Sequence, residues 1–238
     1  MKGNESLGTV EKPSLYLFLT EIPRAIGAFI KGYGYYLNKP KVSATKGSPV
    51  LVLPGFLGSD LSTSVLRKYL KKSGYHAYGW GLGRNLANLK DLKKIDKIIN
   101  QLYTKYENPV VLIGWSLGGV YARHITKHKP DKVAQLITMG SPYMGVAESN
   151  RAHLTFKLVK MGRGFNTFER KWIESLPQPV EVPSTAIYSK NDGIVSWKVC
   201  HEATISNNHQ NIEVTCGHFG MGVCEQVFKA LDSILERE

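Results

Sequence analysis

The sequence predicts an α/β fold in which a mostly parallel central sheet carries helices on both faces. Short apolar segments rich in β-branched residues alternate along the chain with longer segments in which apolar residues recur at helical spacing. At 238 residues, with 42% hydrophobic and 21% charged residues, the chain is long enough for one large domain with a substantial buried core. It contains no internal repeat, and no apolar run is long enough to span a bilayer.

Residues 1–47 are expected to form a helical extension that packs on the main domain. Between residues 14 and 37, apolar residues recur at helical spacing, and Pro23 fits the first turn of a second helix that begins at Thr20 or Glu21. Another interpretation stays open, in which aromatic side chains with lysines nearby contact an anionic membrane surface. The residues of that surface are Phe18, Phe29, Tyr33, Lys31 and Lys39.

The main domain is expected over residues 48–144 and 184–238. Strands are predicted at residues 50–53, 75–80, 133–139, 184–189 and 211–215, and a further strand starts at Val110. Helices are predicted at about residues 60–72, with Ser59 or Asp60 as the N-cap, around 88–107, after Ser116 and at the C-terminal end. Residues 145–183 lack a strand pattern and mix apolar with basic residues, which suits a small helical cap over a pocket.

The stretch from Val110 onward reads VVLIGWSLGG and then continues in good helix formers. This pattern predicts a strand, a sharp turn and a helix, with Ser116 at the apex. Gly114 and Gly118 permit the strained turn because neither carries a Cβ that would clash with the neighbouring chain. The turn exposes the serine hydroxyl and places the amide of Leu117 at a helix N-terminus, where it can meet a developing negative charge.

A serine nucleophile needs a base, and a histidine base needs an acid that orients it and stabilises its charged form. In an open parallel sheet, ligands bind beyond the carboxyl ends of the strands. The aspartates stand at positions 60, 91, 96, 131, 192 and 232, and only Asp192 follows a predicted strand. His218 follows the strand at residues 211–215 and is the preferred base, and His201 is its only rival.

The motif at residues 114–119, followed by Asp192 and then His218, resembles the α/β-hydrolase superfamily, whose catalytic triad runs in that order. Residues 54–59 (PGFLGS) resemble the oxyanion loop of its lipase and esterase members, and residues 138–142 (TMGSP) resemble a strand-end turn of bacterial lipases. The resemblance covers residues 48–238. Proline at 54 and Tyr143 stand where many lipases have histidine, which argues against a true triglyceride lipase.

The mechanism implied by this resemblance is serine acyl transfer. Ser116 attacks an ester carbonyl while His218 takes its proton, and the backbone amides of Phe56 and Leu117 stabilise the oxyanion. The mechanism calls for no metal and no organic cofactor. Substrate contacts are expected from Trp115, Leu57 and Tyr143.

The predicted function is hydrolysis of carboxylic esters, with short to medium acyl chains favoured because a small cap encloses only a limited pocket. An acyltransferase or thioesterase would use the same triad, and a true lipase acting at a membrane surface is a further alternative. An intact serine, aspartate and histidine set argues against a non-catalytic lipid-binding protein. The expected ligand is therefore a small-molecule ester or lipid.

The composition bears on partners and compartment. The net charge of +12 favours anionic surfaces, but no nucleic-acid-binding signature is visible and the lysines are dispersed, so no nucleic-acid partner is expected. Peripheral contact with an anionic membrane stays open, and the sequence does not indicate an oligomeric state. Three cysteines without metal-ligand spacing and the lack of a convincing signal peptide favour a cytoplasmic protein.

Overall fold

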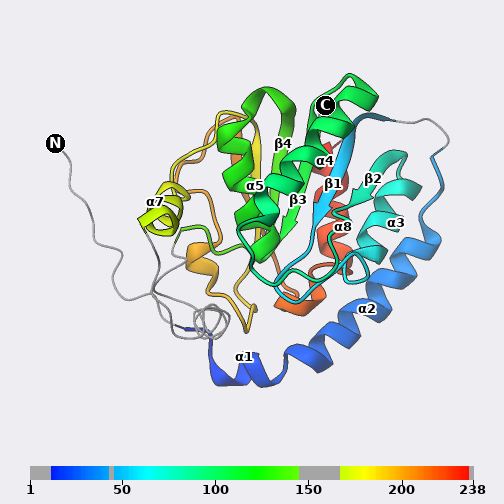
Figure 1. Cartoon of the computed structure of the whole chain (residues 1–238). Coiled ribbons are helices and arrows are strands. Elements are labelled where there is room, and N and C mark those ends of the chain that lie inside the picture. The colour runs from blue at the N-terminus through cyan, green and yellow to red at the C-terminus, as the bar shows by residue number, and fades with distance from the viewer. Residues whose placement is uncertain (1–11, 43–45, 145–166, 236–238) are drawn as a thin grey trace.

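A single six-stranded sheet forms the centre of the molecule. The computed structural model of the protein describes residues 12–42, 46–144 and 167–235 (Figure 1). All neighbouring strands of the sheet run parallel, in the order β2-β1-β3-β4-β5-β6. The strands are β1 (Lys46–Leu53), β2 (Tyr75–Gly79), β3 (Val110–Trp115), β4 (Val133–Met139), β5 (Ser184–Ser189) and β6 (His209–Val214). The predicted α/β architecture is confirmed, and the sheet is wholly rather than mostly parallel.

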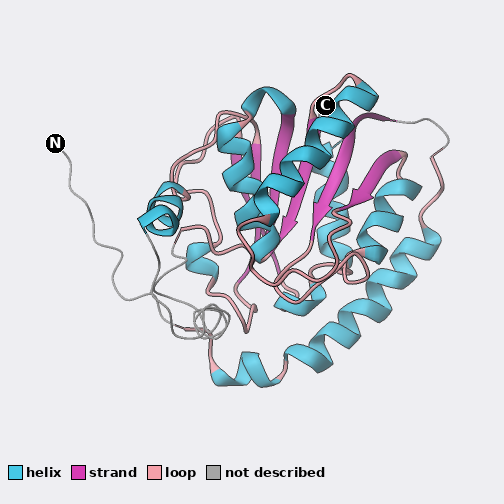
Figure 2. Ribbon diagram, viewed as in Figure 1, coloured by secondary structure: helices cyan, strands magenta, loops and turns pink. Residues whose placement is uncertain are grey.

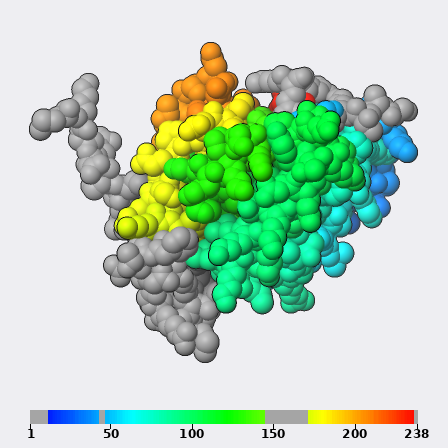
Figure 3. All heavy atoms as spheres, turned by 45° about the horizontal axis from the view of Figure 1, so that its top comes forward, coloured from blue at the N-terminus to red at the C-terminus, as the bar shows by residue number. Residues whose placement is uncertain are grey.

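Helices cover both faces of the sheet (Figure 2). One face carries α3 (Ser64–Lys72) and α8 (Glu225–Leu235), and the other carries α4 (Asp91–Tyr106) and α5 (Leu117–His128). The outer sides of α4 and α5 form one continuous surface in the space-filling view (Figure 3). Short 3₁₀ turns lie at Pro130–Lys132, Trp197–Val199 and His218–Gly220. No helix within the described ranges has both the length and the hydropathy that crossing a bilayer requires.

The alternation of side chains along the strands explains why both faces bury a core. In β1, Val50 and Val52 pack beneath α3 and α8, whereas Leu51 and Leu53 pack beneath α4 and α5. Successive side chains of a strand point to opposite faces of the sheet, so a strand covered on both sides needs apolar residues at every position. The continuous apolar runs in the sequence are the consequence.

The start of α3 differs from the prediction. Neither Ser59 nor Asp60 caps this helix, because its N-cap position is Thr63. The Asp60 carboxylate instead accepts hydrogen bonds from the backbone N–H groups of Trp80 at 2.9 Å and Gly81 at 3.0 Å. A carboxylate that satisfies two backbone donors just beyond β2 holds the loop after β1 against that strand.

The N-terminal segment forms two helices, α1 (Leu15–Leu19) and α2 (Glu21–Asn38), as the sequence predicted. The α2 helix contacts α8 and the turn at His218–Gly220, and it runs along the lower edge of the molecule (Figure 1). At its C-terminal end, the Lys39 ammonium lies 2.6 Å from the Asp232 carboxylate of α8. The side of α2 that faces α8 and the turn is covered by these contacts, whereas a different, apolar side of α1 and α2 is exposed to solvent.

The structure describes only part of the cap that was expected at residues 145–183. Helix α7 (Thr167–Ser175) is described, and its Trp172 packs with the core beneath α4 and α5. Residues 145–166 lie outside the described residues, so the cap stays a prediction.

A buried ion pair fastens α5 to the loop before β6. The Arg123 guanidinium, which is 0% exposed, donates to both carboxylate oxygens of Glu202, at 2.6 and 2.9 Å. It also donates to the backbone carbonyls of Leu176 at 2.6 Å and Gln178 at 2.9 Å. Because the guanidinium has a partner in each direction, its burial leaves little charge uncompensated.

Candidate active site

Ser116 occupies a sharp turn between β3 and α5. Its backbone angles, φ 52° and ψ −121°, lie in a region that residues other than glycine rarely adopt. Holding a residue in such a conformation costs about 1–3 kcal/mol. A Cβ at Gly114 would lie 2.3 Å from the Cα of Gly119, and one at Gly118 would lie 2.3 Å from the carbonyl oxygen of Leu53. Glycine at both positions is therefore required for the helix to approach the strands this closely.

Asp192 and His218 meet beyond the carboxyl ends of β5 and β6. His218 Nδ1 lies 2.6 Å from Asp192 Oδ2, and both side chains are buried. The other carboxylate oxygen accepts the backbone N–H groups of Ile194 at 2.8 Å and Val195 at 2.7 Å. With Nδ1–H donating to the carboxylate, Nε2 is left to accept a proton, as a general base must.

The surroundings of His218 change its basicity. Burial lowers the pKa of the imidazole, but the charge of Asp192, its hydrogen bond and the charge of Glu21 outweigh that effect. The net result is that the pKa of His218 is raised above its ordinary value of 6.5. The neutral ring that can accept a proton is consequently populated only at higher pH.

Ser116 lies at the same edge of the sheet as the acid and base pair. Its N–H donates to the carbonyl of Met139 at 2.8 Å. Gly140, which follows Met139 at the end of β4, lies against the side chains of His218 and Asp192. A Cβ at Gly140 would be 3.1 Å from His218 Nδ1 and 3.2 Å from Asp192 Oδ2. Among the described contacts, no hydrogen bond joins the Ser116 hydroxyl to His218; in ligand-free sites such bonds are often long and tighten when substrate binds.

The loop after β1 lies over the serine. A Cβ at Gly55 would be 3.1 Å from Ser116 Cβ. Within the described part of the chain, the amides of Phe56 and Leu117 donate no hydrogen bond, so both are available to an oxyanion. The Leu117 amide is the first of α5, where the helix dipole also favours negative charge.

Asn85 braces this loop, a role that the sequence analysis missed. The side chain, 0% exposed, donates to the Pro54 carbonyl at 2.9 Å. Its backbone carbonyl accepts the Leu57 N–H at 2.8 Å, and its own N–H donates to the Gly58 carbonyl at 2.8 Å. The asparagine in a glycine-rich loop indicated a turn, but the sequence does not show which segment this asparagine would bind. That depends on β2 lying next to β1 in the sheet.

The predicted substrate contacts separate into two groups. Leu57 is exposed on the loop over Ser116, and Trp115 is half-buried, with its ring centroid 6.2 Å from that of His218. The prediction for Tyr143 is wrong, because its side chain is 0% exposed and its ring lies 4.0 Å from the Arg123 guanidinium. Tyr143 thus belongs to the core, where burial raises its pKa well above the ordinary value.

The rival histidine lies outside this cluster. His201 Nδ1 lies 3.3 Å from the Trp197 carbonyl, and its ring packs against Tyr188 and Trp197. His124, on α5, is held neutral because burial lowers its pKa to about 4. Neither is paired with Asp192.

Glu21 is a second residue in contact with the site that the sequence analysis did not single out. Its carboxylate is 1% exposed and accepts backbone N–H groups from Gly193 at 2.7 Å, His218 at 3.0 Å and Phe219 at 3.1 Å. Arg24, one turn along α2, donates to it at 3.0 Å. The sequence gives no sign of this arrangement, since an acidic residue at the start of a helix usually faces solvent.

Comparison with known proteins establishes the family. The family model described as palmitoyl protein thioesterase matches residues 49–215, which is more than half of the chain. The chain belongs to this family. Its α1 and α2 helices precede the matched region, and His218 follows it.

Solved structures with the same fold agree with this assignment. One of the metagenome-derived lipolytic enzymes LipS and LipT has a TM-score of 0.61 at 15% identity, covering 84% of this chain and 100% of that one. The thioesterase domain from the curacin biosynthetic pathway has a TM-score of 0.56 at 15% identity, covering 80% and 91%. The alpha/beta hydrolase domain-containing protein 10 from mouse gives 0.56 at 19% identity, covering 81% and 91%. The α/β-hydrolase fold is confirmed.

The chain is also similar in sequence to a curated protein that is described as a phospholipase and acyltransferase. The lysosomal phospholipase A and acyltransferase of Bos taurus is 26% identical over 145 residues. The match covers 56% of this chain and 33% of that protein, so the chain spans about a third of the relative's length. Family and fold together identify a hydrolase enzyme whose relatives include thioesterases, esterases, lipases and an acyltransferase.

Proposed function

We propose that the protein is a serine hydrolase that cleaves carboxylic esters through an acyl-enzyme on Ser116. The observation that carries the proposal is the buried pair of Asp192 and His218, joined at 2.6 Å beside the strained serine turn. A catalytic role as acid and base, acting on the Ser116 nucleophile, accounts for the burial of the ionisable side chains of Asp192 and His218 at the edge of the sheet.

Acylation begins when Ser116 Oγ attacks the ester carbonyl carbon and its proton passes to His218 Nε2. The carbonyl oxygen becomes an oxyanion that accepts hydrogen bonds from the amides of Phe56 and Leu117. Collapse of this intermediate breaks the bond to the alcohol oxygen, which leaves with the proton from His218. Asp192 stays ionised and stabilises the imidazolium while it exists.

Deacylation repeats these steps with water. His218 takes a proton from the water molecule, whose oxygen attacks the acyl carbon, and the second oxyanion collapses to release the acid and restore Ser116. Replacing water by an alcohol or a thiol acceptor would make the enzyme an acyltransferase, and replacing the ester by a thioester would make it a thioesterase. The family match favours testing the thioester first.

The preferred acyl group is proposed to be short to medium in length. The exposed Leu57 and the half-buried Trp115 lie at the serine and can remove part of an acyl chain from water, at roughly 0.8 kcal/mol per methylene. The gain ends where the apolar surface ends. We expect kcat/KM to peak at short or medium chain length and to fall for long chains.

A substrate panel tests this function. p-Nitrophenyl esters and acyl-coenzyme A thioesters of matched chain lengths would be assayed with the wild-type protein and with Ser116→Ala. Turnover of esters that depends on Ser116 and peaks at short or medium chain length supports the proposal. A larger kcat/KM for every thioester would assign a thioesterase, and a steady rise through long chains at an oil–water interface would assign a lipase.

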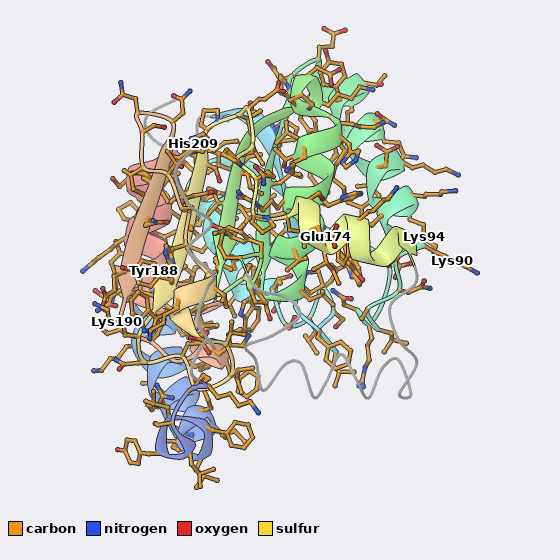
Figure 4. The ribbon with its side chains drawn as sticks, turned by 90° about the vertical axis from the view of Figure 1, so that its left-hand side faces the viewer. Lys90, Lys94, Glu174, Tyr188, Lys190 and His209 are labelled. Atoms are coloured by element: carbon orange, nitrogen blue, oxygen red, sulfur yellow. The ribbon has the colours of Figure 1, made fainter. Side chains whose placement is uncertain are left out.

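We further infer that α1 and α2 rest on an anionic membrane. One side of α2 exposes six apolar residues within an arc of about 100°, at 3.6 residues per turn. They are Ile22, Ile26, Phe29, Ile30, Tyr33 and Leu37. On α1, Leu15, Tyr16 and Leu19 are also exposed, and the side chains of both helices extend away from the body of the protein (Figure 4). An apolar side of this extent on a surface helix is typical of an interfacial contact.

Charge favours a bilayer over a second protein copy as the occupant of this apolar side. Within residues 12–42, the only acidic side chain is the buried Glu21, whereas five residues are basic. They are Lys12, Arg24, Lys31, Lys39 and Lys41. With a net charge of +12, two copies would repel each other, while anionic headgroups would attract. The three free cysteines are those expected of a cytoplasmic protein, so we place this contact at the cytoplasmic side of a membrane.

Vesicle sedimentation tests the contact. Binding to phosphatidylglycerol vesicles is expected, with weaker binding to phosphatidylcholine vesicles and loss of binding as salt is added. Replacing Ile22 and Ile30 by serine should abolish binding, whereas Ile205→Ser, at an exposed isoleucine before β6, should not. Equal binding by the double variant, or a stable dimer of the wild-type protein that the double variant loses, would contradict the inference.

A further inference from the structure

A carboxylate from the N-terminal helix holds both loops that carry the acid and base pair. Glu21 Oε1 accepts the N–H groups of Gly193, directly after Asp192, and of His218, while Oε2 accepts the N–H of Phe219. We propose that Glu21 is a positioning residue that fixes the Asp192 loop relative to His218. This inference rests on the proposed function of that pair.

The geometry explains why one residue can set the alignment. Gly193 lies beyond β5 and His218 beyond β6, where the hydrogen-bonded ladder between the two strands has ended at Ser189 and Val214. Glu21 Oε1 joins the two loops at 2.7 and 3.0 Å. Besides the hydrogen bond between Asp192 and His218 themselves, the loops are joined in the described structure by Asn191 Nδ2, which donates to the Thr215 carbonyl at 2.9 Å and is exposed to solvent. The Glu21 link, which is buried and charge-assisted, is stronger than the exposed Asn191 link.

Arg24 completes the arrangement. Its guanidinium donates to Glu21 at 3.0 Å, to the Leu17 carbonyl at 2.7 Å and to the Asn191 carbonyl at 2.6 Å. The guanidinium therefore ties α1 and α2 to the loop before Asp192. Its positive charge also opposes that of the Glu21 carboxylate, which lowers the negative charge that His218 experiences.

The ionisable groups around His218 give opposite predictions for two variants. Asp192 and Glu21 are negative and raise the pKa of the ring, and Arg24 beside Glu21 is positive. The thiols of Cys200 and Cys216 are kept neutral. Burial and then the charge of Asp192 raise the pKa of Cys200, whereas a hydrogen bond with Cys224, followed by burial, raises the pKa of Cys216. Glu21→Gln should therefore lower the pKa of His218, and Arg24→Gln should raise it.

The kinetic test compares Glu21→Gln with a matched control. Asp91 is also a buried carboxylate at the start of a helix, and it pairs with Lys94 at the same i,i+3 spacing as Glu21 and Arg24, but it makes no described hydrogen bond to the loops of Asp192 and His218. Glu21→Gln should lower kcat roughly tenfold with KM little changed, because the pair is misaligned rather than lost. It should also move the acid limb of kcat/KM to lower pH. Asp91→Asn should change stability but neither kcat nor the pH profile.

Two further measurements keep the outcome decisive. If Glu21→Gln fails to fold, Arg24→Gln must move the acid limb to higher pH, and Glu21→Asp must keep part of kcat. NMR titration of the His218 ring reports the same pKa changes without turnover, so it separates this inference from the proposed function. Wild-type kcat and an unshifted limb in Glu21→Gln and Arg24→Gln, or an equal shift in Asp91→Asn, would overturn the inference. An inactive wild-type protein with the expected NMR shifts would overturn only the function.

Discussion

Replacing Gly140 by alanine should damage the acid and base pair while leaving the protein folded. Gly140 has φ +53°, and a Cβ there would lie 2.9 Å from Met221 Sδ, 3.1 Å from His218 Nδ1 and 3.2 Å from Asp192 Oδ2. Contacts this short require the imidazole or the carboxylate to move by a few tenths of an ångström. Because the 2.6 Å bond between them is already short, the pair must re-orient as a unit.

The size of the effect follows from two separate contributions. The left-handed backbone alone costs alanine roughly 1–2 kcal/mol, which corresponds to a fall in Tm of about 2–8 °C for a domain of this size. Misplacing a catalytic group costs roughly 10²-fold in rate for a displacement of about 1 Å, so a fall in kcat of about 10- to 100-fold is expected for Gly140→Ala. KM should change little, because the substrate surface is untouched.

Gly81→Ala is the matched control. Gly81 has φ +68°, and nothing lies within 4 Å of a Cβ at that position. It should therefore reproduce the fall in Tm without the fall in kcat. Both variants would be measured by thermal unfolding and by ester hydrolysis under saturating substrate. Equal kcat in the two variants would refute the argument that Gly140 is glycine because of its contact with the pair.

Four other predictions follow from the same geometry. Asp192→Asn should lower kcat by roughly 10⁴ with KM nearly unchanged, since the histidine loses its orientation and its countercharge; a loss below tenfold in steady-state kinetics would contradict this. Asn85→Leu should lower kcat by roughly 10- to 100-fold because the loop carrying the Phe56 amide loses the side-chain hydrogen bond from Asn85 to the Pro54 carbonyl; a wild-type rate would show that the loop does not need this hydrogen bond. Because the pKa of His218 is raised and only its neutral form accepts a proton, the acid limb of a kcat/KM profile should have its midpoint above pH 6.5, and a midpoint below that value would disagree. Arg123→Met should destabilise the fold by about 3–5 kcal/mol in urea unfolding, since a buried Glu202 carboxylate loses its partner, and a loss below about 1 kcal/mol would contradict a buried pair of this kind.

The sequence predicted the strands well where apolar runs end in turn residues. Both ends of β4 and β5 are as predicted, because Val133–Met139 and Ser184–Ser189 are bounded by glycine, proline or charged residues. The start of β1 was placed four residues too late, at Val50 rather than Lys46. Residues 46–49 include glycine, serine and proline, so only pairing with β2, which begins at Lys46 opposite Tyr75, makes them a strand.

Parallel topology explains why the candidate triad could be chosen from sequence alone. Ligand sites of such sheets lie beyond the carboxyl ends of the strands, and this rule selected Asp192 and His218 from among the aspartates and histidines. The structure then brings these two side chains within hydrogen-bonding distance. Their catalytic roles, and that of Ser116, stay predictions until measured.

The residues that sequence reasoning misplaced all depend on contacts between distant segments. Asp60 was expected to cap a helix but binds the backbone after β2, and Tyr143 was expected at the substrate but packs on Arg123. Glu21 and Asn85 were not singled out, because their partners lie on loops that only the folded sheet brings near. Local propensity carries no information about such partners.

Direct detection of the acyl-enzyme tests the central claim most closely. The protein would be mixed with a p-nitrophenyl ester, quenched within the first turnover and analysed by intact mass and peptide mapping. A burst of one p-nitrophenolate per chain is expected, with the acyl mass on the peptide that contains Ser116 and no adduct in Ser116→Ala. An adduct on another residue, or hydrolysis by Ser116→Ala at the wild-type rate, would contradict the assignment of Ser116 as the nucleophile.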